Sequence, residues 1–244
     1  MAKRWSDRSN DPAGADLLEH RRREVPPPAS DGVADDRTEY LCAQVKGKSI
    51  LDVGVVAHTL AAAESPAWLH GRLRESAAAC LGVDVLAEEV AALAARGYDV
   101  VCADLTQAPL ERRFDVIVAG EVIEHLDHTG AFMRNCAAML APEGRLIVTT
   151  PNPWYANAIV KSAFGGGFVD NADHVAWLDP FTLFELGERN GLRLDRIVRM
   201  QRARPRTLAG MLFFWLRPAL VAAGVNPRVF SKSLIYEFVR NESR

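Results

Sequence analysis

The chain has 244 residues and a formal net charge of −2, from 29 basic and 31 acidic residues. This length suits one α/β domain with additions, and the charge balance excludes a global attraction to nucleic acid or to an anionic membrane. The four cysteines have no Cys-x-x-Cys spacing and the first residues have no apolar segment. These features argue against a zinc site, a disulfide framework and a signal peptide, and they favour a cytoplasmic location.

The first part of the chain has no periodic pattern. Residues 1–37 mix charged residues with Pro, Asp and Gly, which predicts a disordered or loosely docked leader. Residues 38–46 are expected to form a short helix that covers one edge of the core. Residues 38–244 are expected to form a single domain.

Short apolar segments alternate with helical patterns from Ser49 onward. Helices are clearest at 86–96 and 130–140, and residues 142–144 (Pro-Glu-Gly) predict a turn. Such alternation is typical of βαβ units in a parallel, doubly wound sheet. The strands expected in this part are Ser49–Val53, Ala79–Val83, Asp99–Ala103, Phe114–Ala119 and Gly144–Thr149.

Beyond residue 151 the pattern changes. Residues 152–173 contain aromatic residues and three consecutive glycines, and we expect them to form a lid. A helix at 180–190 and strands at 192–200 and 233–239 complete a sheet of seven strands.

Residues 205–232 are expected to form an apolar helical insertion. Its segment 208–225 is rich in Leu, Phe, Trp and Ala, but it is too short to span a membrane and is interrupted by Arg217 and Pro218. Core or partner-facing helices are one interpretation. A helix in peripheral contact with a membrane is the alternative.

Acidic residues end three successive predicted strands. Asp52 is followed by Gly54, and a glycine directly after the first strand lets the backbone approach a cofactor closely. Asp84 and Asp104 end the next two strands, where carboxylates accept hydrogen bonds from a ribose and an adenine amino group. The three acids together predict a nucleotide-cofactor pocket, although each alone is also compatible with a helix cap.

Several short motifs occur in an order typical of one family. They are Leu51–Gly54, Gly82–Asp84, Ala103–Leu105, Phe114–Ile117 and Leu140–Leu146. On these motifs, residues 39–200 resemble class I S-adenosylmethionine-dependent methyltransferases. The resemblance implies an α/β, Rossmann-like fold with a doubly wound, mostly parallel seven-stranded sheet, and S-adenosyl-L-methionine as cofactor. The cofactor-binding residues that it implies are Asp52, Gly54, Asp84, Val85, Asp104, Leu105 and Glu121.

The glycine loop departs from the family pattern. Val56 and His58 stand where the family has further glycines, and their side chains would crowd the cofactor unless the loop takes another path. The insertion at 59–73, with Trp68 and His70, is expected to rebuild that wall. The alternative is that cofactor binding is lost and the chain is a non-catalytic, methyltransferase-like binding protein.

A Glu-x-x-Glu-His cluster follows the fourth of these strands. If the chain is helical there, the spacing places Glu121, Glu124 and His125 on one face. Two carboxylates and an imidazole can hold a hard divalent cation or move a proton. The alternatives are a solvated first helical turn, or a Glu that caps a helix beside a His packed near the cofactor.

The cluster resembles two methyltransferase branches, the ubiquinone-pathway catechol O-methyltransferases and the enzymes that methylate the 2′-hydroxyl at the 3′ end of small RNAs. The RNA branch continues with Thr-Pro-Asn and with Asp-His before a Trp, matched here by residues 150–152, Asp173, His174 and Trp177. The resemblance implies Mg²⁺ or Mn²⁺ held by Glu121, Glu124, His125 and His174. The catalytic residues that it implies are His125, His174 and Glu121.

The chemistry favours an O-methyltransferase. Methyl transfer from a sulfonium requires an aligned and partly deprotonated acceptor oxygen. A metal with open positions favours a vicinal diol, and without a metal His125 or His174 is the general base. We therefore expect a hydroxyl of a glycan, a glycoconjugate precursor or another small metabolite as acceptor. RNA is a further alternative, disfavoured by the slightly acidic balance although arginines are frequent at 193–206.

Overall fold

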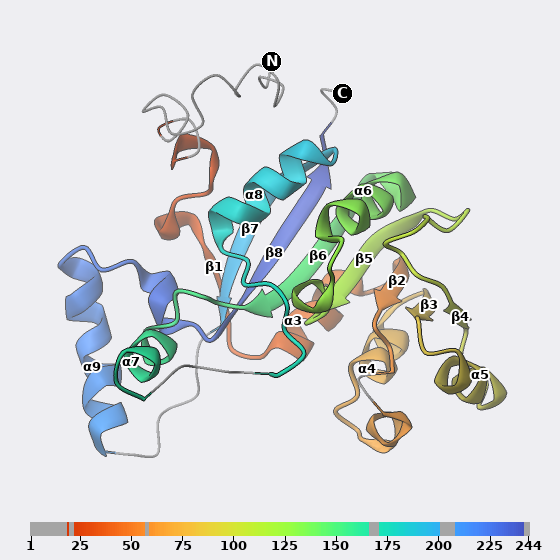
Figure 1. Cartoon of the computed structure of the whole chain (residues 1–244), viewed down its shortest axis with the longest axis horizontal. Coiled ribbons are helices and arrows are strands. Elements are labelled where there is room, and N and C mark those ends of the chain that lie inside the picture. Colours follow the sequence, from red (N-terminus) through yellow and green to blue (C-terminus); the bar gives the residue numbers. More distant parts are fainter. Residues whose placement is uncertain (1–18, 20–21, 57–58, 166–170, 201–207, 242–244) are drawn as a thin grey trace.

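The computed structural model describes residues 19, 22–56, 59–165, 171–200 and 208–241 (Figure 1). Among these residues, one sheet has eight strands in the order β1-β7-β8-β6-β5-β2-β3-β4. Only β8 is antiparallel to its neighbours in this sheet. The strands are β1 (Gly32–Ala34), β2 (Ser49–Val53), β3 (Ala79–Asp84), β4 (Val100–Cys102), β5 (Phe114–Gly120), β6 (Leu140–Pro151), β7 (Leu192–Met200) and β8 (Ser233–Arg240).

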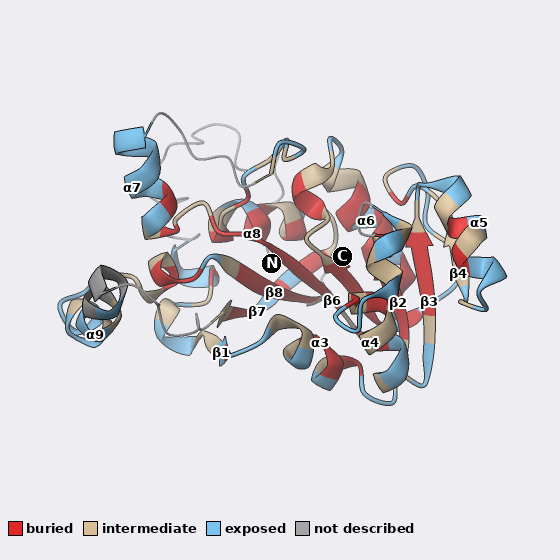
Figure 2. Ribbon diagram, turned by 90° about the horizontal axis from the view of Figure 1, so that it is seen from below, coloured by how far each residue is buried: buried red, intermediate tan, exposed pale blue. Residues whose placement is uncertain are grey.

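Helices cover both faces of the sheet. Figure 2 shows α6 and α8 on one face and α3 and α4 on the other. The α-helices are α3 (Arg37–Val45), α4 (Leu69–Ser76), α5 (Ala87–Ala95), α6 (Thr129–Met139), α7 (Ala156–Gly165), α8 (Pro180–Arg189) and α9 (Leu208–Ala222). The 3₁₀ helices are η1 (Pro28–Ser30), η2 (Leu60–Glu64), η3 (Ile123–His125) and η4 (Pro227–Phe230).

The central strands are apolar on both faces, which is why they form continuous apolar runs in the sequence. Ile117 packs in one core cluster with Phe132 of α6, whereas its neighbour Val118 packs in another with Leu41 of α3. Successive side chains of a strand point to opposite faces, so a sheet covered twice needs apolar residues at every position. The doubly wound architecture expected from the sequence is confirmed.

The predicted turn at 142–144 is wrong. These residues belong to β6, where the pairing with β5 shifts register between Phe114 and Val116. A Cβ on Gly144 would lie 2.9 Å from the Phe114 carbonyl oxygen. The glycine therefore permits a close backbone approach at an irregularity inside a strand, and this local pattern is easily mistaken for a turn.

Part of the predicted leader contacts the domain, and it supplies an eighth strand where seven were expected. Val25 is buried, and β1 pairs with β7. The guanidinium of Arg228, 2 % exposed, donates to the Asp31 carboxylate at 2.6 and 2.9 Å and to the Pro26 carbonyl at 2.6 Å. A buried, bidentate ion pair between segments nearly 200 residues apart leaves no periodic pattern in the sequence.

The two additions beyond β6 are helical. The predicted lid contains α7, while the Gly166–Phe168 part of that prediction lies outside the described residues. The predicted apolar insertion contains α9 and η4. None of the helices in the described ranges is both long enough and apolar enough to cross a membrane.

Candidate active site

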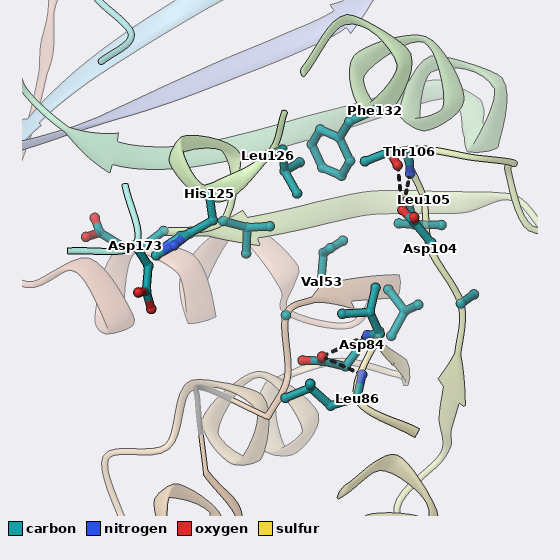
Figure 3. Close-up of a pocket in the computed structure, with 16 residues that line it drawn as sticks. Val53, Asp84, Leu86, Asp104, Leu105, Thr106, His125, Leu126, Phe132 and Asp173 are labelled. Atoms are coloured by element: carbon teal, nitrogen blue, oxygen red, sulfur yellow. Dashed lines mark hydrogen bonds between the residues drawn. The ribbon is translucent and has the colours of Figure 1, made fainter. Parts of the chain in front are cut away.

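A cavity of about 340 Å³ lies at the carboxyl edge of β2, β3 and β5 (Figure 3). It collects most of the residues predicted to bind a cofactor. Figure 3 places Asp104 at one end of the cavity and His125 with Asp173 at the other. The predicted residues that line it are Gly54, Asp84, Val85, Asp104, Leu105, Glu121, His125 and Asp173.

Both the backbone conformation at position 54 and the neighbouring Val122 side chain require a glycine there. Its φ is +79°, a left-handed conformation that side chains disfavour, and a Cβ there would lie 2.7 Å from Cγ2 of Val122. Its amide donates to the Val83 carbonyl at 2.8 Å. The backbone after β2 is therefore held against β3 and forms one wall of the cavity.

Asp84 fixes the altered glycine loop. One carboxylate oxygen accepts from the amides of Val85 at 2.8 Å and Leu86 at 3.2 Å, and the other accepts from the Val56 amide at 3.0 Å. The Val56 side chain is 2 % exposed and packs with Trp68 rather than lining the cavity. The loop therefore takes a path in which Val56 does not fill the cavity. His58 lies outside the described residues.

Asp52 does not line the cavity, contrary to the sequence prediction. It is 2 % exposed, and its Oδ2 lies 2.9 Å from Nδ1 of His70. Burial raises the pKa of Asp52, while the hydrogen bond with His70 acts in the opposite direction. His70 comes from the insertion, whose Trp68 also donates from Nε1 to the Val55 carbonyl at 2.9 Å. The insertion supports the loop from behind, so Asp52 is bonded to the protein's own imidazole.

Asp104 and Leu105 line the end of the first cavity that lies opposite to His125 and Asp173. Oδ1 of Asp104 accepts from the amide and hydroxyl of Thr106 at 2.8 and 2.7 Å, and these bonds hold the pKa of Asp104 below its usual range. Asn135 of α6 donates to the Leu105 carbonyl at 2.8 Å. Both residues are held by local hydrogen bonds, with the carboxylate kept ionised.

The backbone of the Glu-x-x-Glu-His cluster does not form one continuous helix, so Glu121 is separated from Glu124 and His125. Glu121 has φ +60°, and its amide donates to the Thr149 carbonyl at 3.0 Å. Its carboxylate lies 3.4 Å from Nη1 of Arg37. Only Ile123–His125 form a helical turn, and it is 3₁₀. The expectation that Glu121 shares one helix face with Glu124 and His125 is therefore wrong.

Glu124, His125 and His174 form a compact cluster. One potential ligand atom from each lies within 4.8 Å of the others. The two imidazole rings have centroids 4.8 Å apart and are nearly perpendicular. The segment carrying His174 is held by the amides of Val175 and Ala176, which donate to the Glu124 carbonyl at 3.0 and 3.1 Å. Residues 50 positions apart thus meet at one point.

Glu124 has an unusual environment. It is 1 % exposed, and neither carboxylate oxygen has a hydrogen-bond partner within the described ranges. Burial raises its pKa to about 7 and the nearby charge of Glu121 acts in the same direction, while weak contacts with its own amide and the Thr150 hydroxyl act in the opposite direction. A buried carboxylate without partners is costly, because the desolvated charge has no compensating donor or cation.

A second cavity of about 330 Å³ adjoins the first at Glu121, which lines both. It lies where β7 ends and β8 begins, with Arg37 and Lys232 supplying positive charge. Its other lining residues are Asp35, Asp36, Met200 and Ser233. Sequence reasoning did not single out this cavity, because its walls come from four separate segments.

Several residues of the first cavity were also missed. Leu86 and Thr106 line it, as do Val122, Leu126 and Phe132. The first two stand two positions after a strand-end acid, and that position could have identified them. Phe132 belongs to the apolar pattern of α6 and has no such signal.

Comparison with known proteins gives a consistent picture. The methyltransferase-domain family model matches residues 18–197. A ubiquinone biosynthesis O-methyltransferase of Bradyrhizobium sp. (strain ORS 278) is 38 % identical over 93 residues, covering 34 % of this chain and 37 % of that enzyme. The enzyme of the same name from Coxiella burnetii (strain Dugway 5J108-111) is 28 % identical over 173 residues, covering 65 % and 70 %. The chain thus spans well under half of the Bradyrhizobium relative.

Solved structures share the fold. The small RNA methyltransferase HEN1 superposes with a TM-score of 0.57 at 18 % identity, covering 85 % of this chain and 25 % of that one. Magnesium protoporphyrin IX methyltransferase from Synechocystis PCC 6803 gives a TM-score of 0.54 at 16 % identity, covering 92 % and 84 %. At these identities the similarity concerns the fold alone, and it agrees with the sheet described above.

Proposed function

Because the chain belongs to the methyltransferase-domain family, whose model matches residues 18–197, we propose that it is an S-adenosylmethionine-dependent O-methyltransferase. The acceptor in this proposal is a hydroxyl of a glycan, a glycoconjugate precursor or a similar small metabolite. The observation that carries it is the cavity of preset cofactor-binding groups beside the cluster of Glu124, His125 and His174.

The first cavity fits the cofactor. Gly54 keeps the backbone beside the cavity free of a side chain, because a Cβ there would meet Val122, and the carboxylates of Asp84 and Asp104 stand at successive strand ends. These acids have lone pairs beyond those used by backbone amides, which suits a ribose and an adenine amino group. S-adenosylmethionine, when bound, supplies a methyl group on a sulfonium. The chain's tasks are to align the acceptor oxygen and to take its proton.

The cluster fits a divalent cation such as Mg²⁺ or Mn²⁺. Glu124, His125 and His174 would hold it, and the support is the buried Glu124 carboxylate that lacks hydrogen-bond partners in the described part of the chain. Such an ion supplies Lewis acidity that favours a vicinal diol as acceptor. Glu121 is outside this ligand set and faces Arg37.

In the form of the proposal without a metal ion, His125 is the residue of this chain best placed to accept the acceptor's proton. It lines the cavity, whereas Glu124 lies buried beneath it. His174 packs edge-on against the His125 ring and fixes its position. The second cavity, which shares Glu121 with the first, is the proposed acceptor site, and its mixed charges suit a polar, hydroxylated compound.

Calorimetric titration with S-adenosylhomocysteine tests the proposal, with repeats in Mg²⁺, in Mn²⁺ and in EDTA. We expect micromolar binding of the cofactor product, corresponding to about 8 kcal/mol. A separate metal response, lost in His125→Ala and His174→Ala, would support the diol form of the proposal. If S-adenosylhomocysteine fails to bind under every condition, the chain is a non-catalytic binding protein and the proposal is wrong.

A further inference from the structure

His70 and Asp52 form a buried ionisable pair behind the first cavity. His70 is the second residue of α4 and is 1 % exposed, and its Nδ1 lies 2.9 Å from Oδ2 of Asp52. The ring centroids of Trp68 and Tyr98 lie 5.1 and 5.9 Å from that of the imidazole. These aromatic side chains restrict the orientation of the imidazole, so Nδ1 is held toward the carboxylate.

The surroundings of the imidazole indicate which nitrogen carries its proton. Nε2 of His70 is buried and has no hydrogen-bond partner among the described residues, so a proton there would be a buried N–H without an acceptor. The favoured form is a neutral imidazole whose Nδ1–H donates to the ionised Asp52 carboxylate. Such a bond is difficult to replace, because removing one partner leaves the other buried and unpaired.

The start of α4 lies against the strands that carry the cofactor-binding residues. A Cβ on Gly82 of β3 would lie 2.9 Å from Cε1 of His70. A Cβ on Gly120 of β5 would lie 2.8 Å from Cδ2 of Leu69. Glycine at these two positions therefore lets α4 approach β3 and β5 closely. The hydrogen bond between His70 and Asp52 ties the same turn of α4 to β2.

Trp68 connects this turn of α4 to the glycine loop. It stands two residues before His70, and its Nε1 donates to the Val55 carbonyl at 2.9 Å. On the other side of the loop, the amide of Val56 donates to the Asp84 carboxylate at 3.0 Å. The path of the loop is thus fixed by two side-chain hydrogen bonds, one from the start of α4 and one to the end of β3.

We propose that His70 is a positioning residue for the cofactor. Through its bond to Asp52 it fixes the start of α4, and the helix in turn holds residues 54–56 in the path that forms one wall of the first cavity. His70 does not line that cavity, so it acts on the shape of the wall and not on a bound molecule. The consequence for cofactor affinity rests on the proposed function, whereas the effect of His70 on the loop does not.

Variants of the full chain separate positioning from stability. His70→Phe keeps an aromatic ring between Trp68 and Tyr98, but it cannot donate to Asp52. His70→Asn keeps a donor near the position of Nδ1. Leu73→Ala is the matched control, because Leu73 is a buried residue of the same helix that packs outside the cluster of Trp68. Its loss lowers stability without touching the pair.

Amide hydrogen exchange without any ligand measures the loop directly. The amides of Gly54 and Val56 both donate to acceptors of β3, so they exchange slowly while the loop is held. Relative to the amides of β5, we expect exchange at least about tenfold faster at both positions in His70→Phe, a smaller change in His70→Asn and none in Leu73→Ala. Unchanged relative exchange in His70→Phe would overturn the proposal, whether or not the chain binds a cofactor.

Titration with S-adenosylhomocysteine measures the consequence for the site. At a temperature where every variant is folded, we expect at least about a tenfold loss of affinity in His70→Phe, partial recovery in His70→Asn and wild-type affinity in Leu73→Ala. Equal losses in His70→Phe and Leu73→Ala would show a general effect of stability and would also overturn the proposal. Failure of the wild type to bind would contradict the proposed function, and the exchange experiment would still decide the role of His70.

The pH dependence of affinity adds a readout that packing alone does not change. The charged groups facing Asp52 are His70 of α4, Asp84 of β3 and Arg37 of α3, and Cys80 of β3 lies 3.9 Å from Nδ1 of His70. Burial raises the pKa of Asp52, while the hydrogen bond with His70 acts in the opposite direction. Asp84 adds to the rise of this pKa and Arg37 opposes it.

The sign of the expected shift follows from these influences. The bond from His70 requires an ionised Asp52, so affinity should fall as the pH drops through the pKa of Asp52. His70→Asn removes the imidazole that lowers this pKa, and we expect the fall in affinity to occur at higher pH than in the wild type. A constant ratio of the two affinities across the pH range would mean that His70 only fills space, and the proposal would be wrong.

Discussion

The two halves of the carboxyl edge of the sheet differ in how their acidic side chains are hydrogen-bonded. On the side of β2, β3 and β4, the polar groups of Asp84 and Asp104 are already bonded to backbone amides or neighbouring hydroxyls. On the side of β5 and β6, the carboxylate of Glu124 is buried without a hydrogen-bond partner among the described residues. In the first half, the protein's own hydrogen bonds therefore already hold the carboxylates in place. In the proposed function, a divalent cation completes the second half.

The largest expected effect is on cofactor affinity in the half formed by β2, β3 and β4. Gly54→Ala should reduce S-adenosylhomocysteine affinity by about 100-fold or more, because the new Cβ meets Val122 at 2.7 Å in a backbone with φ +79°. Gly97→Ala is the control, since Gly97 has φ +84° but open space around it and lies away from the cavity. Equal losses in the two variants would show that backbone strain, rather than the cavity wall, decides affinity.

Asp84→Ala tests whether the preset hydrogen bonds matter. The substitution leaves the amides of Val56, Val85 and Leu86 without their carboxylate, and it removes an acceptor for the ribose. We expect a loss of about 10- to 100-fold in S-adenosylhomocysteine affinity, measured by calorimetry. Unchanged affinity would mean that the cofactor lies elsewhere.

Glu124→Gln should abolish the response to metal ions without changing cofactor binding. Mg²⁺ or Mn²⁺ at about 100 times its Kd should raise the wild-type Tm by about 5–11 °C, and we expect this increase to disappear in the variant. S-adenosylhomocysteine affinity should change little. Glu121→Gln is the matched control, because Glu121 is paired with Arg37 and lies outside the compact cluster. A metal response retained in Glu124→Gln would contradict the proposed ligand set.

The smallest expected effect comes from Arg37→Gln. Its ion pair with Glu121 is about one third exposed on each side, and such pairs contribute less than about 1 kcal/mol. We expect a rise of about threefold in the acceptor KM with kcat little changed. Arg72→Gln, which removes a more exposed ion pair with Glu39 away from both cavities, should leave KM unaltered. If both variants behave alike, Arg37 has no special role in the second cavity.

The sequence predicted the sheet well because its strands carry strong local patterns. β2 and β7 have the predicted bounds, since an uninterrupted apolar or alternating run stops where burial stops. β1 has three residues and no such run. It pairs with β7 and follows Asp31, which is bonded to Arg228, so contacts between residues distant in sequence decide its structure.

The site was predictable only in part for the same reason. Gly54, Asp84 and Asp104 lie at or just after the ends of their strands, and strand order alone brings them to one cavity. Asp52 obeys the same sequence rule, but it turns toward His70 of an insertion that no local pattern relates to it. Glu121 was misplaced because a single left-handed residue replaced the expected helix.

Strand β8 has a consequence for the order in which the molecule can assemble. It is the last strand along the chain, yet it lies between β6 and β7 in the sheet (Figure 1). During synthesis, β2, β3, β4 and β5 can pair as soon as they emerge, whereas β6 and β7 present open edges until residues 233–240 have been made. Open edges invite pairing with other chains. The nascent protein therefore passes through a stage in which β2 to β5 can already pair, while β6 and β7 are the part exposed to aggregation and to chaperones.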